Sequence, residues 1–248
     1  MSLVIGIKCD DGSIVVASDT AMSLRGDSAD YVSVKLEKIY CEGDYILAMA
    51  GAVWLNQKVR RLAKEIFKDR TDFTQDMFRD FLDGTGEIIK EDILLRLSKG
   101  LESEEEIKNS IAIDVLIAYR DREKGENKIW VEDNTLRGRY VEEKFVVFSG
   151  NDLAYMPLKE FEESEIGVQE GKLLAFKAVK DTMRLSSSFV AEPIDIVVLD
   201  NEGKMSRLEK NEIQNIAKAY DKMRIELYGL LRTAANDIDK QHKLRSKN

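Results

Sequence analysis

The chain has 248 residues, of which 44% are hydrophobic, and it carries a net charge of -8 with a single histidine. This length suits one well-buried domain, and the acidic balance argues against nucleic-acid binding, because a phosphate-binding surface needs an excess of Lys and Arg. The one histidine, His242, lies in a basic tail, which argues against histidine-based catalytic triads and against a zinc hydrolase.

A β-hairpin is predicted for the first segment, "LVIGIKCDDGSIVVASDTAMS". β-Branched residues alternate in both arms, and Asp11-Gly12 is a typical hairpin turn. Asp19 lies at the end of the second arm, so the hairpin brings this carboxylate to the same end of the ladder as Met1 and Ser2. We expect the chemistry at this end.

Strands and helices alternate along the rest of the chain. Apolar residues at helical spacing predict one helix from Leu55 and a second over 73–93. The other predicted elements are strands over 31–40, 44–51, 111–121, 128–133 and 144–150, helices over 152–161 and 172–184, and a last hairpin over 194–210. This order predicts the α+β class, with two antiparallel sheets between two helix layers in a four-layer αββα sandwich.

A long amphipathic helix is predicted after the sandwich. Its apolar stripe runs from Ile213 to Ile238 at helical spacing and is followed by the basic sequence "KQHKLRSKN". We therefore expect a main domain over residues 1–210 and a C-terminal helix with a basic tail over 211–248. This helix is expected to pack on the same domain or on a neighbouring subunit.

The two cysteines, Cys9 and Cys41, lie far apart, and neither belongs to a CxxC or Cys/His motif, which favours a reduced protein. No stretch approaches the roughly twenty apolar residues that a membrane span needs, and the first residues do not resemble a signal peptide. We expect a cytoplasmic protein that needs no metal or other cofactor and binds neither nucleic acid nor a membrane.

Five segments are similar, in this order, to strands of proteasome-type subunits: "VIGIKCDDGSIVVASD", "VKLEKIY", "YILAMAGA", "VVFSGND" and "PIDIVVLDNEG". The chain resembles the N-terminal-nucleophile hydrolase superfamily, in its proteasome β branch or in the branch of HslV, the bacterial relative that pairs with an unfoldase ring. The resemblance covers about residues 2–213. It implies the αββα fold and a peptidase whose N-terminal hydroxyl is activated by its own α-amine, a base with an unperturbed pKa of about 8.

The resemblance also assigns residues to the site. Asp19 matches the carboxylate of the family's hairpin and Lys35 its lysine, which would stay charged beside the carboxylate and lower the proton affinity of the hydroxyl. Gly51 matches the glycine whose backbone N–H lines the oxyanion hole. Ser149 and Ser188 match serines near the terminal amine.

The nucleophile position departs from the family, which has threonine there. Ser2 and Leu3 compete for this position, and the register of the first hairpin decides between them. A two-residue Asp11-Gly12 turn pairs Val4 with Asp19 and places Ser2 on the face of Asp19. A three-residue loop pairs Leu3 with Asp19 instead.

Three functional hypotheses follow. The first is a proteasome-related hydrolase that cleaves peptide bonds in a homo-oligomeric ring, with Ser2 as the nucleophile after Met1 is removed and with a possible regulatory or second-type subunit. The second is a catalytically inactive ring or scaffold subunit, which fits Leu3 on the face of Asp19 and Leu185 where the family has an acidic residue. The third is a hydrolase or transferase that acts on small amides.

Overall fold

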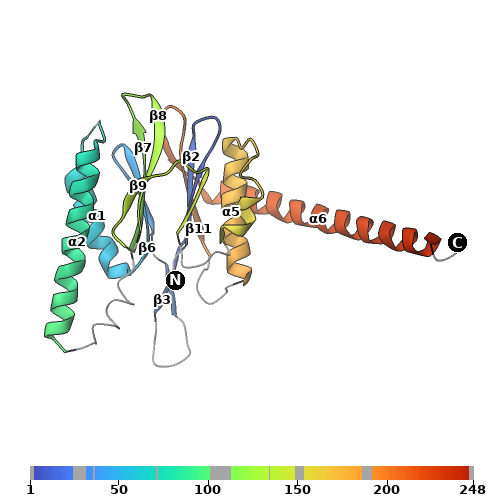
Figure 1. Cartoon of the computed structure of the whole chain (residues 1–248), viewed down its shortest axis with the longest axis horizontal. Coiled ribbons are helices and arrows are strands. Elements are labelled where there is room, and N and C mark those ends of the chain that lie inside the picture. The colour runs from blue at the N-terminus through green and yellow to red at the C-terminus, as the bar shows by residue number, and fades with distance from the viewer. Residues whose placement is uncertain are drawn as a thin grey trace. The chain divides into compact units, whose positions relative to one another are not determined.

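Two five-stranded antiparallel sheets lie face to face at the centre of the main domain (Figure 1). The computed structural model describes residues 3–24, 32–35, 37–70, 72–100, 113–133, 135–148, 154–185 and 192–245. The first sheet has the order β10-β1-β2-β11-β12 and the second has the order β5-β6-β7-β8-β9. The strands of the first sheet are β1 (Val4–Lys8), β2 (Ile14–Asp19), β10 (Phe145–Phe148), β11 (Ile194–Leu199) and β12 (Met205–Arg207). Those of the second are β5 (Ile39–Glu42), β6 (Tyr45–Gly51), β7 (Ile113–Asp121), β8 (Glu126–Glu132) and β9 (Gly138–Tyr140).

Two helices, α1 (Val53–Phe67) and α2 (Gln75–Ser98), cover the outer face of the second sheet (Figure 1). The Thr74 hydroxyl caps α2 by accepting a hydrogen bond from the N–H of Met77. An aromatic cluster fills the space between these helices and the sheet, and its buried rings are Tyr40, Tyr45, Phe67, Phe78, Phe81, Tyr119 and Trp130. Burial of this large apolar area fixes the helix layer on the sheet.

A second apolar cluster joins the inner faces of the two sheets. Val4, Ile14 and Val16 come from the first sheet and pack against residues such as Ile46 of the second. Gly6 permits the close approach, because a Cβ at this position would lie 2.8 Å from the Leu116 side chain. Successive side chains of β1 and β2 point to opposite faces of the first sheet, so one face packs in this core and the other is left for the helices.

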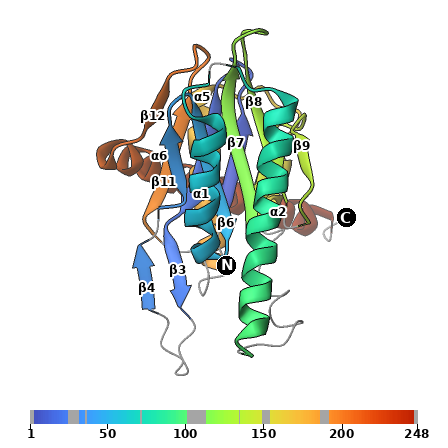
Figure 2. The same cartoon turned by 90° about the vertical axis from the view of Figure 1, so that its left-hand side faces the viewer.

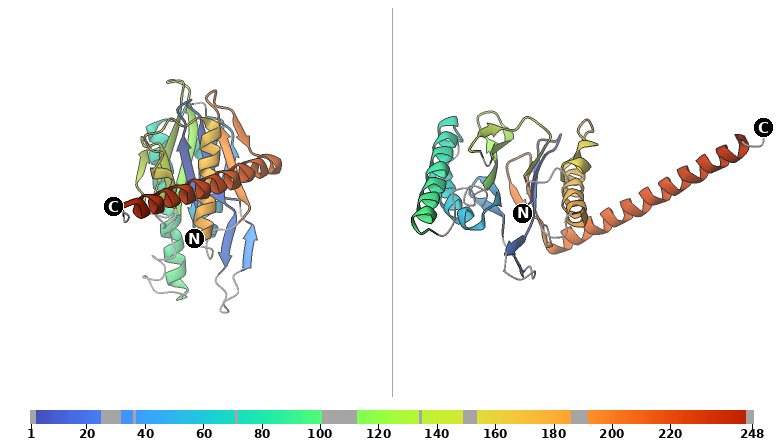
Figure 3. Two further views of the ribbon diagram at one scale, coloured as in Figure 1. Left: turned by 90° about the vertical axis from the view of Figure 1, so that its right-hand side faces the viewer. Right: turned by 60° about the horizontal axis from the view of Figure 1, so that its bottom comes forward.

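Helix α5 (Val168–Leu185) covers the outer face of the first sheet, and the right-hand view of Figure 3 shows the sequence of helix, sheet, sheet and helix. Gly171 allows α5 to lie close to this sheet, because an added Cβ would meet the Sγ of Cys9 at 2.8 Å. The predicted αββα sandwich is confirmed. The helix predicted over 152–161 is shorter than expected, and its described part is α4 (Met156–Lys159).

The segment over 31–40 does not form the single strand that the sequence predicts. Its first part is β4 (Val32–Lys35), which pairs with β3 (Ala21–Leu24) in a separate two-stranded sheet (Figure 2). Its last residues begin β5, which pairs with β6 as expected. The sequence does not indicate the division between β4 and β5, because both parts have strand-like composition and their residues alternate without interruption.

The chain divides into two compact units, Met1–Leu208 and Glu209–Asn248, and the second contains the long helix α6 (Lys210–Arg245). Several large apolar side chains of α6 are more than half exposed: Ile225, Leu227, Tyr228, Leu230 and Leu231. Among the residues that the structure describes, none of the helices combines the length and apolarity needed to cross a membrane.

Candidate active site

The register of the first hairpin places Leu3 opposite Asp19. Val4 pairs with Ser18 and Lys8 with Ile14, so the strands are joined by the longer of the two loops considered. Within this loop Gly12 has a φ of 84°, a conformation that glycine adopts readily. The alternative register, in which Val4 pairs with Asp19, is therefore wrong.

Asp19 is fully buried and holds the start of β1. Its Oδ1 accepts a hydrogen bond of 2.8 Å from the backbone N–H of Leu3. The Leu3 side chain is also fully buried and has no nucleophilic atom, so it serves packing. The contact fixes the backbone N–H of Leu3, and the preceding residue, Ser2, lies outside the described residues.

Lys38 contacts Asp19, and its Nζ lies 2.7 Å from Oδ1 of the carboxylate. The resemblance assigns the lysine of the site to Lys35, and that assignment stays a prediction. Lys35 lies on β4 opposite Ala21, in the separate two-stranded sheet, and the structure does not describe its side chain. Along the chain, the hairpin of β3 and β4 lies between Asp19, which ends β2, and Lys38, which directly precedes β5.

The environment of Lys38 differs from that of a surface lysine. Its side chain is 1% exposed, and burial lowers the pKa of the ammonium below its ordinary value, while the charge of Asp19 and the hydrogen bond to it act in the opposite direction. Burial disfavours the charged form of lysine, and a paired carboxylate favours it. Lys38 can therefore supply a positive charge, and its ammonium loses its proton at a lower pH than that of an exposed lysine.

The other predicted site residues are placed as follows. Gly51 ends β6, where it pairs with Ile113 and has a φ of 115° that only glycine adopts without strain. Ser149 and Ser188 lie outside the described residues. Leu185 ends α5 with a side chain that is 66% exposed. The structure thus brings Leu3, Asp19 and Lys38 together.

Two stacked antiparallel sheets between helix layers define a proteasome-type fold, and the buried Asp–Lys pair lies where the first hairpin begins. Solved structures with this fold include the Anbu complex of Pseudomonas aeruginosa, described as a helical assembly, with a TM-score of 0.70 at 14% identity over 93% of this chain and 95% of that chain. Anbu (ancestral β-subunit) of Yersinia bercovieri has a TM-score of 0.67 at 12% identity over 92% and 97% of the two chains. Anbu of Hyphomicrobium sp. strain MC1 has a TM-score of 0.64 at 15% identity over the same shares.

These similarities correct the family resemblance. Comparison with protein-family models gives no match, and comparison with curated proteins gives none either. The solved structures named above are Anbu proteins, which are distinct from the HslV branch. The expected placement of the chain in the proteasome β or HslV branch was therefore wrong. Identities of this size establish the fold, and the chemistry has to be argued from the site.

Proposed function

We propose that this chain is a proteasome-related N-terminal-nucleophile hydrolase that cleaves amide bonds of peptides. The observation that carries the proposal is the buried Asp19–Lys38 pair at the N-terminal end of β1. Its position next to the Leu3 N–H leaves Ser2 as the adjacent residue with a hydroxyl group. A buried ion pair is costly to keep for stability alone, which favours a chemical role.

The proposed reaction has two steps. After Met1 is removed, the α-amine of Ser2 takes the hydroxyl proton, and the oxygen attacks the carbonyl carbon of the substrate. The Lys38 charge lowers the proton affinity of the hydroxyl, and the Gly51 N–H stabilises the oxyanion. The leaving nitrogen takes the proton from the amine and departs. Water then hydrolyses the ester on Ser2, which restores the hydroxyl and the free amine.

Replacing Ser2 with alanine tests the nucleophile. We expect Ser2→Ala to lower the rate of peptide cleavage about 1,000-fold or more, because alanine offers no oxygen to attack the carbonyl. The measurement is the turnover of fluorogenic peptides and of small amides by purified protein. Ser98→Ala, which changes an exposed serine at the end of α2, is the matched control and should keep full activity. Equal activity in both variants would rule Ser2 out.

A catalytically inactive ring subunit is the second candidate. The observation that favours it is Leu3, rather than a residue with a hydroxyl, directly opposite Asp19. In that case the Asp19–Lys38 pair would only hold the hairpin in place. Wild-type protein that cleaves neither peptides nor small amides would support this candidate.

We also propose that α6 contacts a second copy of this chain. The helical assembly of the similar Pseudomonas protein supports self-association, and the exposed apolar side chains of α6 offer a surface for it. The double change Leu227→Glu/Leu231→Glu should lower the molar mass measured by light scattering, because burying two carboxylates in a contact is unfavourable. Lys218→Glu is the control, because Lys218 lies about two and a half turns before Leu227 and so on the opposite face of the helix. An unchanged mass in the double variant would exclude α6 from the interface.

A further inference from the structure

Three consecutive backbone carbonyls around Lys38 are each held by a different group. The Tyr40 hydroxyl donates to the carbonyl of Glu37 at 2.6 Å, and the backbone N–H of Met49 donates to that of Lys38 at 3.0 Å. The guanidinium of Arg207 donates to the carbonyl of Ile39 at 2.6 Å. The backbone that carries Lys38 is therefore fixed from both sides.

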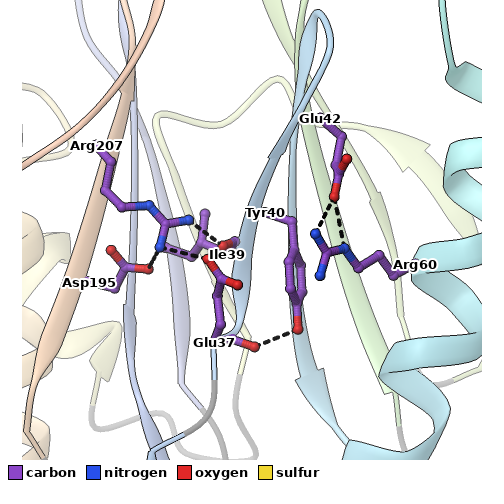
Figure 4. Close-up of polar contacts among 7 residues, drawn as sticks. All are labelled: Glu37, Ile39, Tyr40, Glu42, Arg60, Asp195 and Arg207. Atoms are coloured by element: carbon purple, nitrogen blue, oxygen red, sulfur yellow. Dashed lines mark hydrogen bonds and ion pairs between the residues drawn. The ribbon is translucent and has the colours of Figure 1, made fainter.

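Arg207 reaches this segment from the other sheet. It lies on β12, at one end of the first sheet, whereas Ile39 lies on β5, at one end of the second. Its Nη1 also lies 2.9 Å from a carboxylate oxygen of Asp195 on β11 and 2.9 Å from one of Glu37 (Figure 4). One guanidinium thus joins residues on both sides of Lys38 to the strands of the opposite sheet.

The opposite side of the segment is held by Arg60 of α1. Its guanidinium lies 3.9 Å from the centre of the Tyr40 ring and donates to Glu42 (Figure 4). Burial raises the pKa of Tyr40, so its hydroxyl stays protonated and can donate to Glu37. Tyr40 lies on β5, which Lys38 directly precedes, whereas the Arg207 contact ties β5 to the sheet that carries Asp19.

We propose that Arg207 is a positioning residue that holds the Lys38 ammonium against Asp19, an inference that rests on the proposed function. Asp19 ends β2 of the first sheet and Lys38 directly precedes β5 of the second, so their separation depends on how the edges of these sheets are joined. Arg207 forms this junction with a planar fork of donors, which fixes direction as well as distance. A lysine at the same position has a single ammonium and cannot keep all three contacts in one geometry.

The experiment follows the reactivity of the Lys38 amine in the full-length protein. Arg207→Ala and Arg207→Lys are treated with a limiting acetylating reagent, and acetylation of Lys38 is followed by peptide mass spectrometry. We expect both variants to acetylate at least about tenfold faster than the wild type. Loss of a charge-assisted hydrogen bond allows the buried amine to be exposed more often. We also expect kcat for peptides to fall while KM is nearly unchanged.

Arg122→Ala is the matched control, because Arg122 forms a 2.9 Å ion pair with Asp44 away from Lys38. It should leave both readouts unchanged. Unchanged acetylation of Lys38 in both Arg207 variants would overturn the inference, even if activity fell. Faster acetylation in a protein that cleaves no peptide would support the positioning role and reject the proposed function, so the two failures are distinguishable. Circular dichroism identifies a variant that has unfolded, and Arg207→Lys provides the milder change.

Discussion

Replacing Lys38 with methionine is expected to lower the free energy of unfolding by about 3–5 kcal/mol and to abolish peptide cleavage. Methionine fills a similar volume but removes the ammonium that lies 2.7 Å from the buried Asp19 carboxylate in the native protein. Removing one member of a buried ion pair is costly because the remaining charge cannot reach water. Urea unfolding at neutral pH measures the change, and peptide turnover measures the activity.

A double variant separates the charge from the packing. In Asp19→Asn/Lys38→Met both charges are absent, while the asparagine oxygen can still accept the Leu3 N–H. We expect this protein to regain part of the lost stability but none of the activity. Lys90→Met is the surface control, because Lys90 pairs with Glu87 in an exposed contact that contributes less than about 1 kcal/mol. Equal stability of the Lys38→Met protein and the wild type would mean that the pair is not held as described.

Glu132→Gln is expected to remove a large pH dependence of stability. Glu132 ends β8, is fully buried, and accepts no hydrogen bond within the part of the chain that the structure describes. Burial raises the pKa of this carboxyl to about 8 against the lowering effect of the Thr85 side chain, and the nearby charges of Asp133 and Asp114 act in the same direction as burial. The nearby Thr85 hydroxyl donates to the carbonyl of Phe81 at 2.9 Å. Glu132 is therefore protonated at neutral pH.

The direction of the effect follows from proton binding. Between a pKa of about 4.3 in the unfolded chain and about 8 in the folded one, the folded protein binds more protons, so its stability falls as the pH rises. Each pKa unit corresponds to about 1.4 kcal/mol, which gives a loss of up to about 5 kcal/mol by pH 8.5. Glutamine is neutral at every pH, so Glu132→Gln should be more stable than the wild type at pH 8.5 and similar to it near pH 4.5.

Urea unfolding across this pH range measures both curves. Glu123→Gln, in the exposed turn between β7 and β8, is the control and should follow the wild type. Parallel curves for Glu132→Gln and the wild type would show that the Glu132 carboxyl has an ordinary pKa. The side chain would then be reached by water.

The fold could be predicted from the sequence because apolar periodicity was consistent along the main domain. Alternation in β1 and β2 and the helical stripe of α1 each correspond to one buried face, and Leu55, Val59 and Ala63 of that stripe are buried. The division of the segment over 31–40 between β4 and β5 could not be predicted, because both parts have strand-like composition. A hairpin that pairs only with itself leaves little signal in hydrophobicity.

The site could be predicted only in part. The sequence points to Asp19 because the hairpin brings it to the N-terminal end. It does not point to the contact of Asp19 with Lys38, because that contact depends on the length of the hairpin between them. The sequence carried one signal for Lys38, since it is a charged residue directly before the buried strand residues Ile39 and Tyr40. Arg207 had no such signal, because its partners lie on strands far away in the chain.

Intact mass spectrometry tests the central claim most directly. Untagged protein made from its own start codon is incubated with a peptide epoxyketone, an electrophile that reacts with an N-terminal hydroxyl and its free α-amine. The account predicts a species that lacks Met1 and carries one adduct, and it predicts that Ser2→Ala carries none. A protein that retains Met1 and remains unmodified, or an adduct that persists in Ser2→Ala, would contradict it.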